Sequence, residues 1–182
     1  MKLYKCVDED SGHEFLHSGR ITVDRCEDQN GVILFSPEKL LQDMPADGLM
    51  LEFEVADYSL LVPTARPREC VRMLPVRLSG CEHIDAGYRF KLESDFKLET
   101  IYIGPDCQIG WKYARLHLRK MGMAQTIIKI LAREILDGEN RTVMVIDEWF
   151  VAGENGLRRF TRNPNCPNVC YEAVVPDVAE EE

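Results

Sequence analysis

The sequence predicts an α+β protein dominated by a barrel-like or strongly bent mixed sheet, with one principal long helix near 112–137 packed on that sheet. Two observations lead to this prediction. Short segments in which apolar and polar residues alternate recur along most of the chain, as half-buried strands require. One stretch instead repeats apolar residues at three- and four-residue spacing, which is typical of an amphipathic helix.

The predicted strands occupy both halves of the chain. Residues 20–25 and 32–35 are expected to form a hairpin, because the intervening EDQNG is rich in turn-forming residues. Residues 142–152 form the most apolar segment, which indicates a buried strand. The remaining predicted strands are 1–7, 49–55, 60–62, 71–78, 88–92, 98–103 and 169–175.

Two helices are expected. A short one over 37–43 is favoured by Ser36, since serine is a good N-cap. In the long helix near 112–137, Gly122 lies inside the periodic pattern, where a glycine costs about 1 kcal/mol. Two starting points therefore stay open for this helix, Lys112 and the neighbourhood of Gly122.

The composition is that of an ordinary globular protein of 182 residues with a net charge of −9. We expect one domain over 1–175 and an acidic, flexible tail over 176–182. The acidic balance argues against general nucleic-acid binding and against binding to a membrane surface. Seven scattered cysteines, no secretory signal and no apolar run of membrane length predict a cytoplasmic protein with reduced thiols.

The charge is unevenly distributed. Residues 107–133 contain no Asp or Glu, yet they carry six Lys or Arg residues. A helix N-terminus offers free N–H groups and a positive dipole, so basic residues near it would favour a phosphate or carboxylate. A second basic run near residue 70 could converge on the same place. The candidate ligand-binding residues are Arg68, Arg72, Arg115, Arg119, Lys120 and Gly122.

The segment Arg119-Lys-Met-Gly122-Met-Ala124, followed by the strand predicted over 142–152, resembles the R/Q-x-x-G-x-G/A turn of the GNAT acyltransferases. In that family, backbone N–H groups of this turn hold the pyrophosphate of acyl-coenzyme A. The resemblance covers about the last third of the chain. It implies an acyltransferase that uses coenzyme A through the turn 119–124.

A second resemblance is to PilZ domains, β-barrels that bind a cyclic dinucleotide. Arg68-Glu-Cys-Val-Arg72 is similar to the RxxxR motif of that family, and residues 109–116 resemble its closing strand and helix. The second motif of the family, DxSxxG, is absent from this sequence. The resemblance implies a nucleotide-like ligand at Arg68 and Arg72.

The pentapeptide His13-Glu-Phe-Leu-His17 matches HExxH, in which a helix aligns two zinc-binding imidazoles and the glutamate activates water. Because Gly12 and Gly19 bracket it, we expect a solvated loop and no metal site. Cys166 and Cys170 also lack the second pair of ligands that a zinc site needs.

These observations favour a non-catalytic cytoplasmic module that binds a protein partner or an anionic, nucleotide-like ligand at the basic residues. The alternative is a GNAT-like acyltransferase, the only case in which a cofactor, coenzyme A, is expected. A zinc hydrolase acting through His13 and His17 is a remote alternative. Met121 and Met123 on the long helix also leave a homo-oligomer open.

Overall fold

The computed structural model describes residues 1–24, 32–39, 41, 44–62, 73–78, 80–85, 87–92, 94–136, 139–153, 156–162 and 170–173, and from residue 132 onward the backbone alone. The helices are α1 (Glu9–Ser18), α2 (Trp111–Lys120) and the 3-10 turn η2 (Tyr58–Leu60). The strands are β1 (Lys2–Val7), β2 (Arg20–Asp24), β3 (Val32–Phe35), β4 (Leu49–Val55), β5 (Leu74–Arg77), β6 (Glu82–Ile84), β7 (Gly87–Lys91), β8 (Phe96–Ile103), β9 (Ile127–Leu136), β10 (Glu139–Gly153), β11 (Gly156–Arg162) and β12 (Cys170–Ala173).

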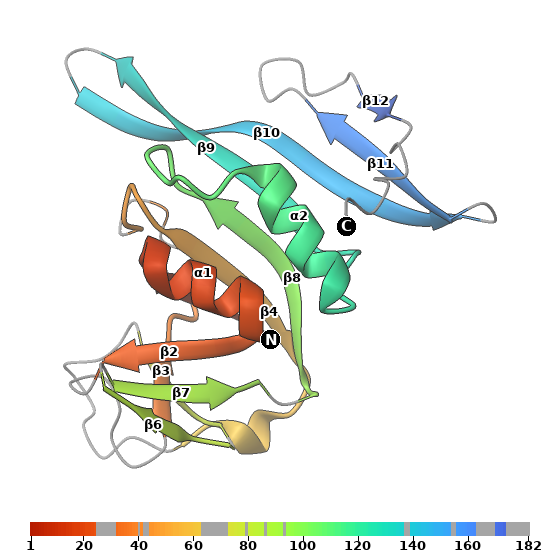
Figure 1. Cartoon of the computed structure of the whole chain (residues 1–182). Coiled ribbons are helices and arrows are strands. Elements are labelled where there is room, and N and C mark those ends of the chain that lie inside the picture. Colours follow the sequence, from red (N-terminus) through yellow and green to blue (C-terminus); the bar gives the residue numbers. More distant parts are fainter. Residues whose placement is uncertain are drawn as a thin grey trace.

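The largest element is a seven-stranded sheet in the order β1-β4-β8-β9-β10-β11-β12 (Figure 1). Its neighbouring strands are antiparallel except for β8 and β9, which are parallel and are connected through α2. Smaller sheets contain β2, β7 and β6, and β3 with β5. The prediction of a sheet-dominated α+β fold with a mixed sheet is confirmed, whereas the strands that the structure describes do not close into a barrel.

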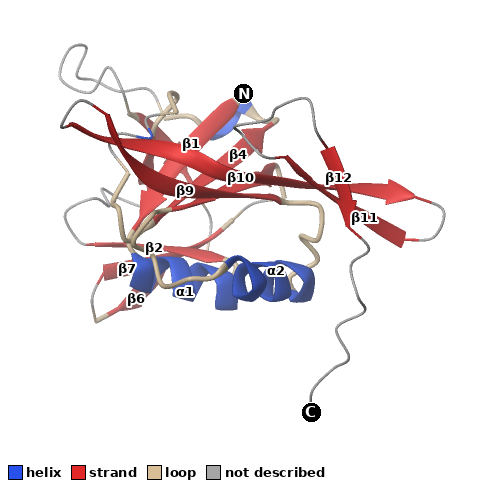
Figure 2. Ribbon diagram, turned by 90° about the horizontal axis from the view of Figure 1, so that it is seen from above, coloured by secondary structure: helices blue, strands red, loops and turns tan. Residues whose placement is uncertain are grey.

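The core lies between the large sheet and the elements on one of its faces. Figure 2 shows α1 and α2 on the same face of this sheet, with β10 and β11 continuing beyond the helices. The main hydrophobic cluster includes the fully buried Phe15, Phe35 and Phe53, which come from α1, β3 and β4. A smaller cluster around Met50 and Tyr102 contains the β4 and β8 residues that alternate with those of the main core.

The expectation of a loop over 13–18 is wrong, because α1 extends from Glu9 to Ser18. Asp8 caps this helix by accepting a hydrogen bond from the backbone N–H of Ser11 at 2.8 Å. Gly12 lies within the helix and faces Leu49 of β4, so a small residue permits the close approach of α1 to the sheet. The glycine that suggests a break in the sequence instead serves the packing of a helix.

Gly19 ends α1 with φ 69°, in the left-handed region, and its N–H donates to the carbonyl of Phe15. Replacing it by alanine should lower the free energy of unfolding by about 1 kcal/mol, since a Cβ strains this conformation. Urea denaturation measures the change. Gly110→Ala is the control for an added Cβ at ordinary φ, because its φ is −73° and no atom lies within 4 Å of that Cβ, so that only the smaller cost of alanine at the N-cap of α2 is expected. A loss in the control equal to that in Gly19→Ala would contradict the backbone explanation.

The prediction of one long helix over 112–137 is wrong. The helix α2 begins at Trp111, ends at Lys120, and is followed by a turn that leads into β9. Gly122 has φ 75°, a left-handed conformation of the kind that ends a helix. β9 then pairs with β8 and β10, and its isoleucines suit a strand. Within the described residues, no helix is long and apolar enough to cross a membrane.

Two further local predictions differ from the structure. The strands β2 and β3 exist, but they do not form a hairpin: β2 pairs with β7, and β3 pairs with β5. Residues 37–39 of the short predicted helix are not helical, although the hydroxyl of Ser36 accepts from the N–H of Glu38 at 3.1 Å. The predicted tail over 176–182 lies outside the described residues.

Candidate functional site

The structure separates the candidate ligand-binding residues. Arg119 and Lys120 are exposed in the last turn of α2, and Gly122 is exposed in the turn that follows. Arg115 is buried, with 7% of its surface exposed. Arg68 and Arg72, and the cysteine at 166, lie outside the described residues. The convergence of the two basic runs therefore stays a prediction, whereas a position of Gly122 at a helix N-terminus is wrong.

Arg115 holds the turn between α2 and β9. Its two terminal nitrogens donate to the backbone carbonyls of Ala124 and Thr126, both at 2.9 Å. Hydrogen bonds from a charged donor are among the stronger ones, and here they fix two points of a turn that has no regular structure of its own. The hydroxyl of Thr126 donates to the carbonyl of Leu98 at 3.2 Å, which ties the same turn to β8.

This turn forms one wall of a groove with a volume of about 1110 Å³. We call it the β8–β9 groove, because the starts of both strands line it. Its lining combines apolar side chains with charged groups of both signs. The lining residues are 94, 96–100, 121–127, Lys2, Glu52 and Lys129. Gly122 is the only candidate residue of the sequence analysis among these lining residues.

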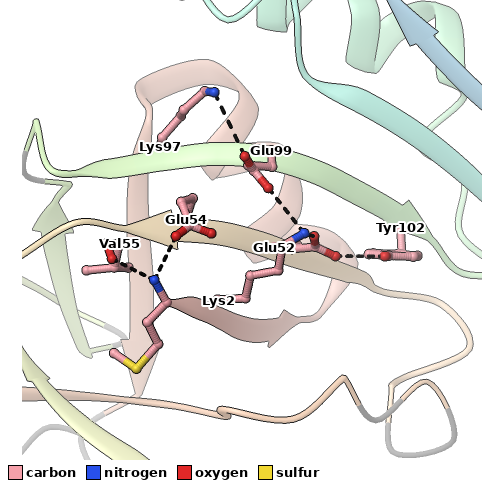
Figure 3. Close-up of polar contacts among 8 residues, drawn as sticks. Lys2, Glu52, Glu54, Val55, Lys97, Glu99 and Tyr102 are labelled. Atoms are coloured by element: carbon pink, nitrogen blue, oxygen red, sulfur yellow. Dashed lines mark hydrogen bonds and ion pairs between the residues drawn. The ribbon is translucent and has the colours of Figure 1, made fainter.

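A buried carboxylate faces this groove. Only 5% of the Glu52 side chain is exposed, and it accepts hydrogen bonds from the hydroxyl of Tyr102 at 2.8 Å and from the amine of Lys2 at 2.5 Å (Figure 3). The hydrogen bond that Lys2 donates to Glu52 raises the pKa of Lys2, although partial burial of the amine opposes this effect. A buried carboxylate is costly unless it is paired, and these two donors pair Glu52.

The strand register explains why these residues meet. Glu52 of β4 lies between Tyr4 of β1 and Thr100 of β8. Lys2 and Tyr102 are two residues from those partners, so they are the diagonal neighbours of Glu52 on the same face of the sheet. Burial raises the pKa of the Tyr4 phenol, and the charge of Glu52 adds to this effect.

Two more amines surround the ring of Tyr102. Lys129, its register partner in β9, places its Nζ 5.6 Å from the ring centroid, and Lys39 places its Nζ 5.4 Å from it. An ammonium at this distance is attracted by the negative face of an aromatic ring. Tyr102 therefore connects the carboxylate of Glu52 with the basic wall that Lys129 provides.

A second carboxylate lies at the rim. The register between β4 and β8 shifts by one residue, and the extra residue in β8 is Glu99. Its carboxylate lies 3.2 Å from the amine of Lys2 and 3.8 Å from that of Lys97. Figure 3 shows Glu99 between these two lysines. Because 72% of the Lys97 side chain is exposed, its amine can exchange this partner for another anion at little cost.

The sequence alone does not identify most of this site. The alternation of residues 49–55 places Glu52 on the polar face of its strand, but does not indicate that it is buried. Lys2 and Tyr102 are each 50 residues from Glu52, and only the register of three strands joins them. The useful signal is the acid-free segment 107–133, because it supplies the turn and Lys129, which form one wall of the groove.

The HExxH pentapeptide lies in α1, so the helix that this motif requires is present. The carboxylate of Glu14, however, is bonded to Arg89 of β7 at 2.8 Å. The hydroxyl of Tyr113 lies 3.3 Å from Nδ1 of His13 and 2.9 Å from Nε2 of His17. Among the residues that the structure describes, no three His, Cys, Asp or Glu side chains are grouped so that they could hold a metal.

The turn 119–124 follows a helix, whereas the acyltransferase turn that it resembles opens one. The N–H groups of Met121, Gly122 and Met123 donate to carbonyls in the last turn of α2. These donors are therefore engaged within the chain. Because the acyltransferase interpretation depends on a helix that begins near Gly122, this geometry does not support it.

Comparison of the chain with models of known protein families, with curated proteins and with solved structures finds no match.

Proposed function

We propose that the protein is a binding module for a small anionic ligand, which is held in the β8–β9 groove. The observation that carries this proposal is the position of three amines, those of Lys2, Lys97 and Lys129, around one groove with partly apolar walls. Amines of this kind suit phosphate or carboxylate groups. The partly exposed apolar residues Met121, Met123 and Ile127 of its lining suit a flat or apolar part of the same molecule.

The two carboxylates of the groove define its polarity. Glu52 is already bonded by two donors, so it contributes a fixed and neutralised floor. Glu99 occupies a position between two amines that a ligand anion could share or take over. A nucleotide-like compound, which combines phosphates with a flat ring, fits this division into a basic rim and an apolar wall.

A thermal-shift panel of coenzyme A, acetyl-coenzyme A, cyclic dinucleotides and inorganic phosphate tests the proposal. We expect at least one organic anion to raise the Tm, with an effect that weakens at high salt because exposed charges are screened. In Lys129→Ala the affinity for that compound should fall about tenfold, which corresponds to the loss of one charge-assisted contact. Lys97→Ala should weaken binding in the same direction.

Lys91→Ala is the matched control, since Lys91 is an exposed lysine of β7 that does not line the groove. Its affinity for the anion should equal that of the wild type. Failure of every anion in the panel to shift the Tm would contradict the proposal. An equal loss of affinity in Lys91→Ala and Lys129→Ala would show a non-specific effect of net charge and would contradict it as well.

A further inference from the structure

Three of the four histidines of the chain meet where α1 contacts α2. The ring centroids of His17 and His117 are 4.4 Å apart, in an edge-to-face arrangement. Tyr113 lies beside all three histidines, with its ring centroid 5.1 Å from that of His13 and 4.3 Å from that of His117. We call these four side chains the histidine seam. The proposed ligand groove does not use any of them.

The direction of the hydrogen bonds in the seam depends on the protonation of its imidazoles. The hydroxyl of Tyr113 has one proton, and it contacts Nδ1 of His13 and Nε2 of His17. It can donate to one of these nitrogens and accept from the other, so the nitrogen that accepts must be unprotonated. When both rings are charged, both nitrogens carry a proton. The phenol oxygen can then only accept from the two rings, and its own proton needs an acceptor outside the seam.

The charges around the seam add to this dependence on protonation. Partial burial lowers the pKa of His117, and the charges of His17, Lys120 and His13 lower it further, although a hydrogen bond to the backbone of Leu16 in α1 opposes this effect. The two histidines and Lys120 are cationic when protonated. Glu14, the carboxylate next to His13 in α1, is bonded to Arg89 of β7 and is therefore already engaged with a cation.

The positions of the rings in their helices make a first positive charge in the seam less costly than a second. His17 and His117 both lie in the last turn of their helices, where the negative end of the helix dipole favours one positive charge. A second proton places two like charges on rings that are in direct contact, and the dipoles do not offset that repulsion. We infer that the histidine seam is a proton-sensitive latch. It joins α1 to α2 while at most one of its imidazoles is positively charged, and it releases the two helices when a second imidazole is protonated.

The direction of the pH effect follows from the same groups. A histidine whose pKa is lowered by folding binds a proton more readily in the unfolded or open state. The contribution of the seam to stability is therefore complete above pH 6.5, the ordinary pKa of histidine. It is lost as the pH falls through the lower folded pKa. Because α2 leads into the turn that lines the β8–β9 groove, release would also move this wall, a consequence that rests on the proposed function whereas the latch does not.

Hydrogen exchange of the whole chain without ligand, at about pH 7.5 and about pH 5.5, tests the latch, with rates corrected for the pH dependence of chemical exchange. Amides of α1 and α2 should lose protection about tenfold relative to those of β4 and β8, as repulsion between two partly exposed like charges predicts. The double variant His17→Gln, His117→Gln should lose most of this difference. A change below about twofold in the wild-type helices would overturn the inference.

His83→Gln is the matched control, because His83 lies in β6 and contacts the ring of Tyr88 edge to face, away from the seam. It should keep the full pH effect, and loss of the effect in this variant would contradict the inference. NMR titration of the wild-type histidines does not depend on any variant. The ring resonances of His117 should titrate below pH 6.5 and should show a second step when a neighbouring ring takes up a proton. A single-step titration of His117 at the ordinary value would overturn the inference.

Discussion

Replacing Arg115 by alanine is expected to lower the free energy of unfolding by about 3 kcal/mol, because hydrogen bonds from a charged group contribute about 1.5–3 kcal/mol each. The guanidinium is buried and holds the carbonyls of Ala124 and Thr126. Its removal leaves both acceptors without this donor and loosens the turn between α2 and β9. Urea denaturation, followed by far-UV circular dichroism, measures the loss.

Two variants separate the role of Arg115 from that of charge. Arg119→Ala removes an equal charge from an exposed position in the same helix, and we expect a change within about 0.5 kcal/mol. Arg115→Lys keeps the charge, but an ammonium lacks the planar fork that reaches two carbonyls, so its stability should fall between the two. Equal stability of Arg115→Ala and Arg119→Ala would contradict the anchoring role.

Replacing Glu52 by alanine is expected to cost about 3 kcal/mol, part of it from the loss of the carboxylate that accepts from the hydroxyl of Tyr102 and part from the cavity in the sheet face. Tyr102 is only 3% exposed, so water cannot readily replace the lost acceptor. Glu52→Gln keeps an oxygen that can accept from this hydroxyl and should cost about 1 kcal/mol. Thermal and urea denaturation of both variants measure the difference.

Glu99→Ala is the comparison for Glu52→Ala, because Glu99 contacts the same lysine, Lys2, from the rim of the groove. Its side chain is 28% exposed and its partners are exposed lysines, so the cost should stay within about 0.5 kcal/mol. A double-mutant cycle between Glu52→Ala and Tyr102→Phe isolates their hydrogen bond, because each of these variants removes it. Additive effects in this cycle, or an equal cost for Glu99→Ala and Glu52→Ala, would contradict a buried and paired carboxylate.

The sequence predicts most of the strands of this fold, because alternation of apolar and polar residues is a local property. Residues 49–55 illustrate this: their apolar positions face the main core, as expected. The pattern around Ile127, Leu131 and Ile135 fits a helix as well as a strand, and pairing with β8 and β10 decides the outcome. Gly12 similarly suggests a break that packing against Leu49 overrides.

The candidate site is predicted less well than the fold, for a physical reason. Its central contacts join residues that are adjacent only through strand register, as Lys2 and Glu52 are. A one-residue change in register would move such side chains to opposite faces, so no local pattern can place them. The charge asymmetry of residues 107–133 does identify one wall of the groove. The sequence analysis, however, places this wall at the N-terminus of a helix, whereas it lies at the C-terminus of α2 and in the turn that follows.

The parallel pairing of β8 with β9 divides the large sheet into two parts, which we expect to form at different stages of folding. On one side, β1 pairs with β4 and β4 with β8, so the pairing of Lys2 with Glu54 closes a loop of about 50 residues. On the other side, β9, β10 and β11 follow one another as neighbouring antiparallel strands. Since closing long loops slows folding, the later strands should assemble first and offer β9 as a template for the rest of the sheet.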